Sequence, residues 1–255
     1  MIDKLDKIER LSRQILSEYN LTSTQLYLFN KIEKKYLKDS INRIFGPPIG
    51  ITDETWPKYD KMSNLELKEW DGDTRMDHIF TLDLKDLDIY NPDKARAMAL
   101  FISDSQYHNA WVPFNDEVKI LFLAEEIVNR GEFQGKLPKK QPENTSSFEI
   151  IPIKVPEEIF RLEELEFESI DEKLFQLLDE LSSLIHNSPH AGGQPIWIQD
   201  MEWNPKRDFL LAQFDENFID VYTRYGMMYI FATNQWVEYN LNGKRYSPTA
   251  FCQFT

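Results

Sequence analysis

Residues 193–203 read GQPIWIQDMEW and have a gapless counterpart in residues 46–56, which read GPPIGITDETW. Both stretches follow the pattern G-x-P-I-x-I-x-D-x-x-W, and a proline follows each tryptophan within two residues. Glycine and proline at the entry favour a turn and disfavour a helix. Side chains alternate along an extended chain, so the two isoleucines of each stretch would project to one face. The pattern predicts that each stretch begins a β-rich unit whose tryptophan fills part of the core.

The likeness between the two halves continues downstream in the same order. Two blocks of the first half, HIFTLD and ALFISD, resemble LLAQFD and YIFATN in the second half. These blocks begin at residues 78, 99, 210 and 229. The sequence therefore predicts an internal duplication, with repeat halves at approximately 46–128 and 190–255.

The remaining chain divides into helical and extended patterns. Apolar residues at steps of three and four predict N-terminal helices over 2–45, one at 2–19 and one at 24–45, and a linking acidic helical region at 156–186. Short apolar runs between turn residues predict strands. They lie at 79–84, 98–102, 118–123, 148–153, 196–198, 209–214, 227–232, 236–239 and 251–254.

These patterns predict one domain, 1–255. Its fold class is α+β, with a predominantly antiparallel β-sheet built from two related β-rich halves with peripheral helices. The polar segment 129–147 is the candidate hinge between the halves.

The composition limits the classes of partner. The 255 residues carry a net charge of −14, which argues against nucleic acid and anionic membranes as partners. No stretch of about 18 apolar residues predicts a membrane span. The one cysteine, Cys252, excludes a disulfide within the chain, and the N-terminus lacks the apolar core of a signal peptide. We expect a cytoplasmic location.

No catalytic motif stands out in the sequence. The serine-hydrolase elbow and both glycine-rich phosphate loops are missing. His186 and His190 flank Pro189 and are not expected to share a helix face, so a zinc site is disfavoured. We expect no metal, no cofactor and, on balance, no enzymatic activity.

Two alternative sites follow from the residues. The first is a protein-binding surface for a basic partner, because residues 157–180 hold ten acidic residues against two basic ones. The alternative interpretation of this region is a solvated helix face that binds no partner. The candidate contact residues are Glu163, Glu164, Glu166, Glu168 and Trp197.

The second alternative is a small-molecule or enzyme site in a cleft between the halves. Its candidate residues are His190, Gln199, Asp200, Gln213 and Asp215.

The second stretch also carries a family resemblance. The segment HAGGQPIWIQ, residues 190–199, resembles the hallmark of the bacterial YwqG-like family, in which a histidine precedes Gly-Gly, a proline, an aromatic residue, an apolar residue and a glutamine. Ala-Gln-Phe-Asp at 212–215 and a glycine before the aromatic strand 226–231 continue the likeness, which covers roughly residues 40–240. The chain departs from the family at 223–225, where Thr-Arg-Tyr replaces a frequent Trp-Gly-Asp.

The resemblance implies an α+β fold dominated by antiparallel sheet and supplies no established activity. Members are similar to proteins found beside bacterial toxin genes, which implies an immunity-type role by association. With the acidic charge, the leading expectation is a non-enzymatic protein-binding protein that neutralises a basic toxin domain.

Overall fold

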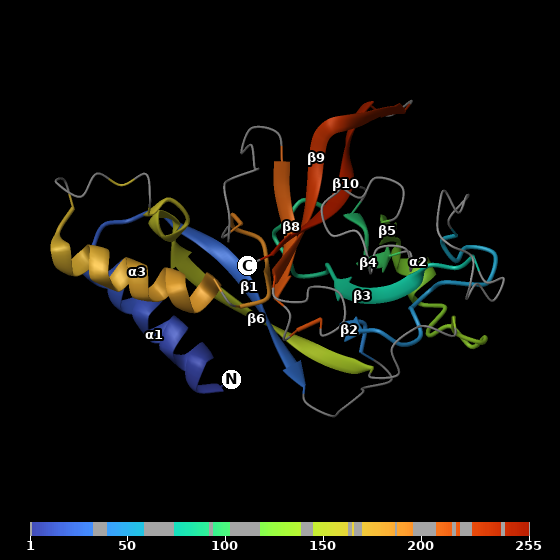
Figure 1. The fold of residues 1–255 in the computed structure, drawn as a ribbon, viewed down its shortest axis with the longest axis horizontal. Coiled ribbons are helices and arrows are strands. Elements are labelled where there is room, and N and C mark those ends of the chain that lie inside the picture. The colour runs from blue at the N-terminus through green and yellow to red at the C-terminus, as the bar shows by residue number, and fades with distance from the viewer. Residues whose placement is uncertain are drawn as a thin grey trace.

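The computed structural model contains ten strands and three α-helices in the part of the chain that it describes (Figure 1). The described residues are 2–32, 40–58, 74–91, 94–102, 118–138, 145–162, 165, 170–186, 188–195, 208–215, 218–219, 226–240 and 243–254. The elements are α1 (Ile2–Glu18), β1 (Ser23–Ile32), β2 (Arg43–Ile44), β3 (Asp77–Asp83), β4 (Ala97–Ile102), β5 (Val118–Leu123), α2 (Glu125–Val128), β6 (Ser146–Pro156), the 3-10 helix η3 (Glu157–Phe160), α3 (Glu172–His186), β7 (His190–Ala191), β8 (Asp208–Asp215), β9 (Gly226–Asn240) and β10 (Gly243–Phe254). The α+β class with a dominant antiparallel sheet is confirmed.

The ten described strands form one sheet in the order β10-β9-β8-β7-β1-β6-β2-β3-β4-β5, and every neighbouring pair is antiparallel. The long strands β1 and β6 lie at its centre. The strands β2 to β5 extend outward from β6 in chain order, and β7 to β10 extend outward from β1. Since β10 also contacts β5, the sheet curls until its two edges approach each other.

The strand ladders on the two sides have matching registers. When residues 78–83 are aligned with 210–215, β3–β4 and β8–β9 pair equivalent positions, such as Phe80 with Leu100 and Ala212 with Ile230. Both ladders shift register just before these pairs. A bulge bends its strand and increases the local twist. The two sides of the sheet therefore bend at the same step.

The main core fills the inside of the curled sheet. Phe80 of β3 and Phe214 of β8 are not on neighbouring strands, yet their ring centroids lie 4.6 Å apart. Phe29, Phe148 and Phe218 complete this aromatic cluster, with neighbouring centroids 5.1–6.0 Å apart. Aromatic pairs at these separations add to the stability gained from burial.

The helices α1 and α3 cover the outer face of β1 and β6 (Figure 1). Ile8 and Ile15 of α1 and Leu181 of α3 pack with Leu26 and Val155 of the two central strands. The apolar spacing of three and four residues places these side chains on one helix face. The predicted helix at 2–19 is confirmed as α1, and no helix in the described part is long and apolar enough to cross a membrane.

The predicted helix at 24–45 is wrong, because its described residues form strands β1 and β2. Leu26 and Leu28 face the helices, whereas Tyr27 and Phe29 face the main core. A strand that is buried on both faces gives a continuous apolar run, which also satisfies helical spacing. The helix expected over 156–186 begins later, with α3 at Glu172, after β6 and η3.

The stretch 46–56 packs in the core as predicted but does not form a regular strand. Its only ladder contact among the described residues is an isolated bridge between Ile49 and Glu132. Ile49, Ile51 and Trp56 are buried together against β4, and the Trp56 indole N–H donates to the Met76 carbonyl at 2.8 Å. The predicted strands at 79–84, 98–102, 118–123, 148–153, 209–214, 227–232, 236–239 and 251–254 fall within or overlap β3, β4, β5, β6, β8, β9 and β10. The predicted strand at 196–198 lies outside the described residues.

Candidate binding site

A glycine turn follows the short strand β7. Gly192 and Gly193 have φ values of +73° and +65°, in the left-handed region that glycine adopts most easily. A Cβ on Gly193 would lie 2.4 Å from Leu26 Cδ2 and 3.0 Å from Phe160 Cζ. A Cβ on Gly192 would lie 3.2 Å from Ile89 Cγ2. The two glycines therefore let the chain turn in close contact with β1, η3 and the 84–91 loop.

A groove of about 470 Å³ opens beside this turn. Ligand pockets commonly have volumes of about 300–1,000 Å³. The walls come from β1, the loop between β3 and β4, η3, the turn and the start of β8. The lining residues are Thr24, Asp88, Ile89, Tyr90, Glu157, Phe160, Gly192, Gly193, Gln194, Phe209 and Leu210.

An aromatic pair forms one wall of the groove. The rings of Tyr90 and Phe209 stack with centroids 5.4 Å apart and an interplanar angle of 10°. Phe209 is 41% exposed, and it is the one large apolar side chain found exposed in the described part of the chain. An exposed ring on the rim of a groove is a ready contact for a ligand or a partner protein.

Two carboxylates contribute negative charge to the groove. The backbone N–H of Asp88 donates to Tyr27 Oη at 2.7 Å, which fixes the loop that carries Asp88. The backbone N–H of Glu157 donates to the Thr22 carbonyl at 3.0 Å. The Glu157 side chain also lies 3.8 Å from the Arg161 guanidinium, in a partly exposed ion pair.

His190 is completely buried immediately before the glycine turn. Its Nδ1–H donates to the Ser188 carbonyl at 2.9 Å, and its Nε2 has no hydrogen-bond partner of normal geometry within the described residues. Burial lowers the pKa of His190 to about 4, although the Ser188 and Gln194 carbonyls act in the opposite direction. The imidazole is therefore neutral near pH 7.

Three candidate cleft residues lie within the described part. His190 of β7 lies opposite Gln213 of β8, so these two residues are brought together. Asp215 lies two residues further along β8, where its carboxylate accepts the Phe218 N–H at 3.0 Å. All three residues are buried and none lines the groove. Gln199 and Asp200 lie outside the described residues.

The five candidate contact residues of the protein-binding surface, Glu163, Glu164, Glu166, Glu168 and Trp197, also lie outside the described residues. The groove residues Asp88, Tyr90, Glu157 and Phe209 were not singled out by the sequence. They belong to segments more than 50 residues apart, which only the sheet topology brings together.

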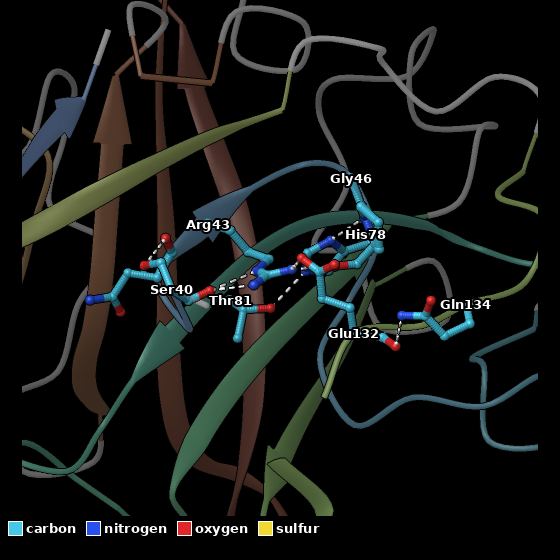
Figure 2. Close-up of polar contacts among 9 residues, drawn as sticks. Ser40, Arg43, Gly46, His78, Thr81, Glu132 and Gln134 are labelled. Carbon is cyan, nitrogen blue, oxygen red and sulfur yellow. Dashed lines mark hydrogen bonds and ion pairs between the residues drawn. The ribbon is translucent and has the colours of Figure 1, made fainter. Parts of the chain in front are cut away.

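A buried ionic cluster occupies the corresponding turn on the other side of the sheet (Figure 2). Arg43 is completely buried, and its guanidinium donates to the Ser40 carbonyl at 3.1 Å, the Pro47 carbonyl at 2.9 Å and Glu132 Oε1 at 2.7 Å. Burial lowers the pKa of Arg43 to about 10 and raises that of Glu132. A buried charge needs such partners, so this cluster holds the first turn together.

His78 extends the same cluster (Figure 2). Its Nδ1 lies 3.1 Å from the Gly46 carbonyl, and its Nε2 lies 2.8 Å from Thr81 Oγ1. Burial lowers the pKa of His78 to about 3. One local signal could indicate this cluster from the sequence, namely an arginine at position 43 between the apolar residues of the run INRIF.

The described lining of the groove offers carboxylates, aromatic side chains, the hydroxyls of Thr24 and Tyr90, one amide and backbone groups, which can pair with or pack against a ligand. No group of three or more His, Cys, Asp or Glu that could hold a metal ion occurs among the described residues. Comparison of the chain with family models, with curated proteins and with solved structures finds no match.

Proposed function

We propose that this chain is a cytoplasmic, non-enzymatic binding protein that recognises a basic protein partner. The observation that carries the proposal is the stack of the partly buried Tyr90 with the exposed Phe209 on the rim of a groove that also contains Asp88 and Glu157. In its most specific form, the partner is a basic toxin domain that the chain neutralises. That form rests on the likeness to the YwqG-like family through residues 190–199.

Physical chemistry supports a protein partner at this surface. Exposed aromatic side chains are frequent anchors of protein interfaces, where they bury a large area with little loss of conformational freedom. The net charge of −14 attracts a basic partner over a distance and speeds its association. The aromatic pair would then contribute to residence time and the excess carboxylates to the rate of encounter.

We also propose that the sheet arose by duplication of one β-rich unit. Three observations support this proposal. The G-x-P-I-x-I-x-D-x-x-W pattern occurs twice. Strands β2 to β5 follow one another outward from β6 in chain order, as β7 to β10 do from β1. The ladders of β3–β4 and β8–β9 also pair equivalent residues. The groove lies at the glycine turn of the second unit.

The test is affinity purification of the tagged chain from its native cells, followed by mass spectrometry. Three baits are compared: the unaltered chain, a chain with Glu163, Glu164, Glu166 and Glu168 all changed to Gln, and Phe209→Leu. We expect a stoichiometric basic protein on the unaltered bait, which is reduced on at least one variant and released by high salt. A partner that is retained equally by all three baits at high salt would contradict the proposal.

A further inference from the structure

We propose that the groove beside Gly192 and Gly193 binds the guanidinium of an arginine side chain presented by the partner protein. The inference deepens the proposed function and rests on it, because it specifies which chemical group of the partner enters the groove. Four properties of the groove lead to arginine: its charge, its aromatic wall, its floor and its size.

The charge of the groove favours a cation. Asp88 and Glu157 come from different elements, and the described lining contains no lysine or arginine. Within the described residues, Glu157 has a countercharge in Arg161, 3.8 Å away in a partly exposed ion pair. Such surface pairs contribute only about 0–1 kcal/mol, so an incoming cation can compete for Glu157. The same carboxylates would repel a phosphate or a carboxylate ligand.

The aromatic wall favours a planar cation. Tyr90 and Phe209 are nearly parallel, both line the groove, and 41% of Phe209 is exposed. A guanidinium stacks on accessible aromatic surface while its N–H groups donate in the plane to a carboxylate. An ammonium group is compact and strongly hydrated and gains less from stacking. Arginine therefore fits this wall better than lysine.

The floor of the groove suits a polypeptide ligand. Gly192 and Gly193 contribute only backbone atoms to the lining, and backbone N–H and C=O groups can pair with those of a polypeptide ligand. Thr24 and Gln194 add a hydroxyl and an amide as hydrogen-bond partners. A volume of about 470 Å³ exceeds the space that one arginine side chain needs, which leaves room for flanking residues of a peptide.

The experiment is a titration of the full chain with blocked tripeptides, followed by the backbone amide NMR signals of Gly192 and Gly193. The probe is acetyl-Gly-Arg-Gly-amide. The control is the same peptide with citrulline, which has the shape of arginine but no charge. We expect the arginine peptide to shift these signals at concentrations where the citrulline peptide does not.

Matched variants identify the contacts. Asp88→Asn removes one charge and should weaken the arginine peptide about tenfold, as expected for loss of one charge-assisted hydrogen bond. Phe209→Leu keeps an apolar side chain but removes the ring face, and should weaken it about threefold. Asp86→Asn changes an exposed acid of the same loop that does not line the groove, and should leave the affinity unchanged.

The outcomes separate this inference from the proposed function. Equal binding of the arginine and citrulline peptides, or no effect of Asp88→Asn, would overturn the guanidinium site. Tighter binding of free arginine than of the tripeptide would overturn the polypeptide source. In either case, capture of a basic partner that is still lost with Phe209→Leu would leave the proposed function standing.

Discussion

Arg43 and His190 occupy corresponding positions in the curled sheet. Each is completely buried and begins a two-residue strand, and each of these strands is followed by two residues with positive φ. Arg43 lies opposite Thr81 of the next strand, and His190 lies opposite Gln213. The two turns thus place a buried basic side chain at the same step. Only the first provides that side chain with an ionic partner, Glu132, among the described residues.

The ion pair in the first turn should be important for stability. Glu132→Gln removes the countercharge that the described residues give the buried Arg43 guanidinium, and we expect the free energy of unfolding to fall by about 2–4 kcal/mol. Urea denaturation followed by circular dichroism measures the change. The control is Glu126→Gln on the exposed face of α2, which should change stability by less than about 0.5 kcal/mol. Equal effects of the two substitutions would show that the buried pair contributes nothing specific.

The two buried histidines should make the fold sensitive to mild acid. The folded pKa values of His78 and His190 are about 3 and about 4, below the ordinary value of 6.5. Between pH 6.5 and 4 the unfolded chain therefore binds more protons than the folded chain, so stability falls as the pH falls. From pH 7.5 to pH 5 each histidine should cost about 2 kcal/mol.

The measurement is urea denaturation at pH 7.5 and at pH 5 for the unaltered chain and for His190→Gln. Glutamine is neutral at both pH values, so the variant should lose about 2 kcal/mol less than the unaltered chain between them. The pH dependence attributed to His190 is refuted when both proteins show the same difference.

The glycine turn beside the groove should tolerate no side chain. Gly193→Ala combines a left-handed backbone with a clash against the buried side chain of Leu26, and we expect a loss of about 2–4 kcal/mol. Gly131 has a φ of +79° but open space around its would-be Cβ. Gly131→Ala should therefore lose only about 1–2 kcal/mol, the cost of the backbone alone. Thermal unfolding of the two variants compares them, and similar losses would contradict the tight packing of the second turn.

The sequence predicted much of the sheet because turn residues bound most of the apolar runs that form its strands. β5 was predicted at its observed bounds, and α1 was predicted to within one residue. The prediction of a helix at the position of β1 was wrong because both faces of this strand are buried. Leu26 to Phe29 therefore lack the alternation that marks a half-exposed strand. The spacing of apolar residues depends on how many faces of an element are buried, so it does not by itself distinguish a fully buried strand from a helix.

The groove was less accessible to sequence reasoning. The glycine and proline at 193 and 195 predict a turn, but nothing local relates Asp88 and Tyr90 to Phe209, which lies about 120 residues later. These residues meet because β7 adds to β1 and leads into β8 beside the 84–91 loop. When the sheet topology alone brings residues together, their spacing in the sequence does not reveal the site.

The most direct test of the account is the dissociation constant of the purified basic partner, measured by isothermal titration calorimetry at low and high salt. We predict that affinity falls with salt and falls at least several-fold with Phe209→Leu, whereas Asp86→Asn has no effect. An affinity that is independent of both salt and Phe209 would contradict recognition of a basic partner at this surface.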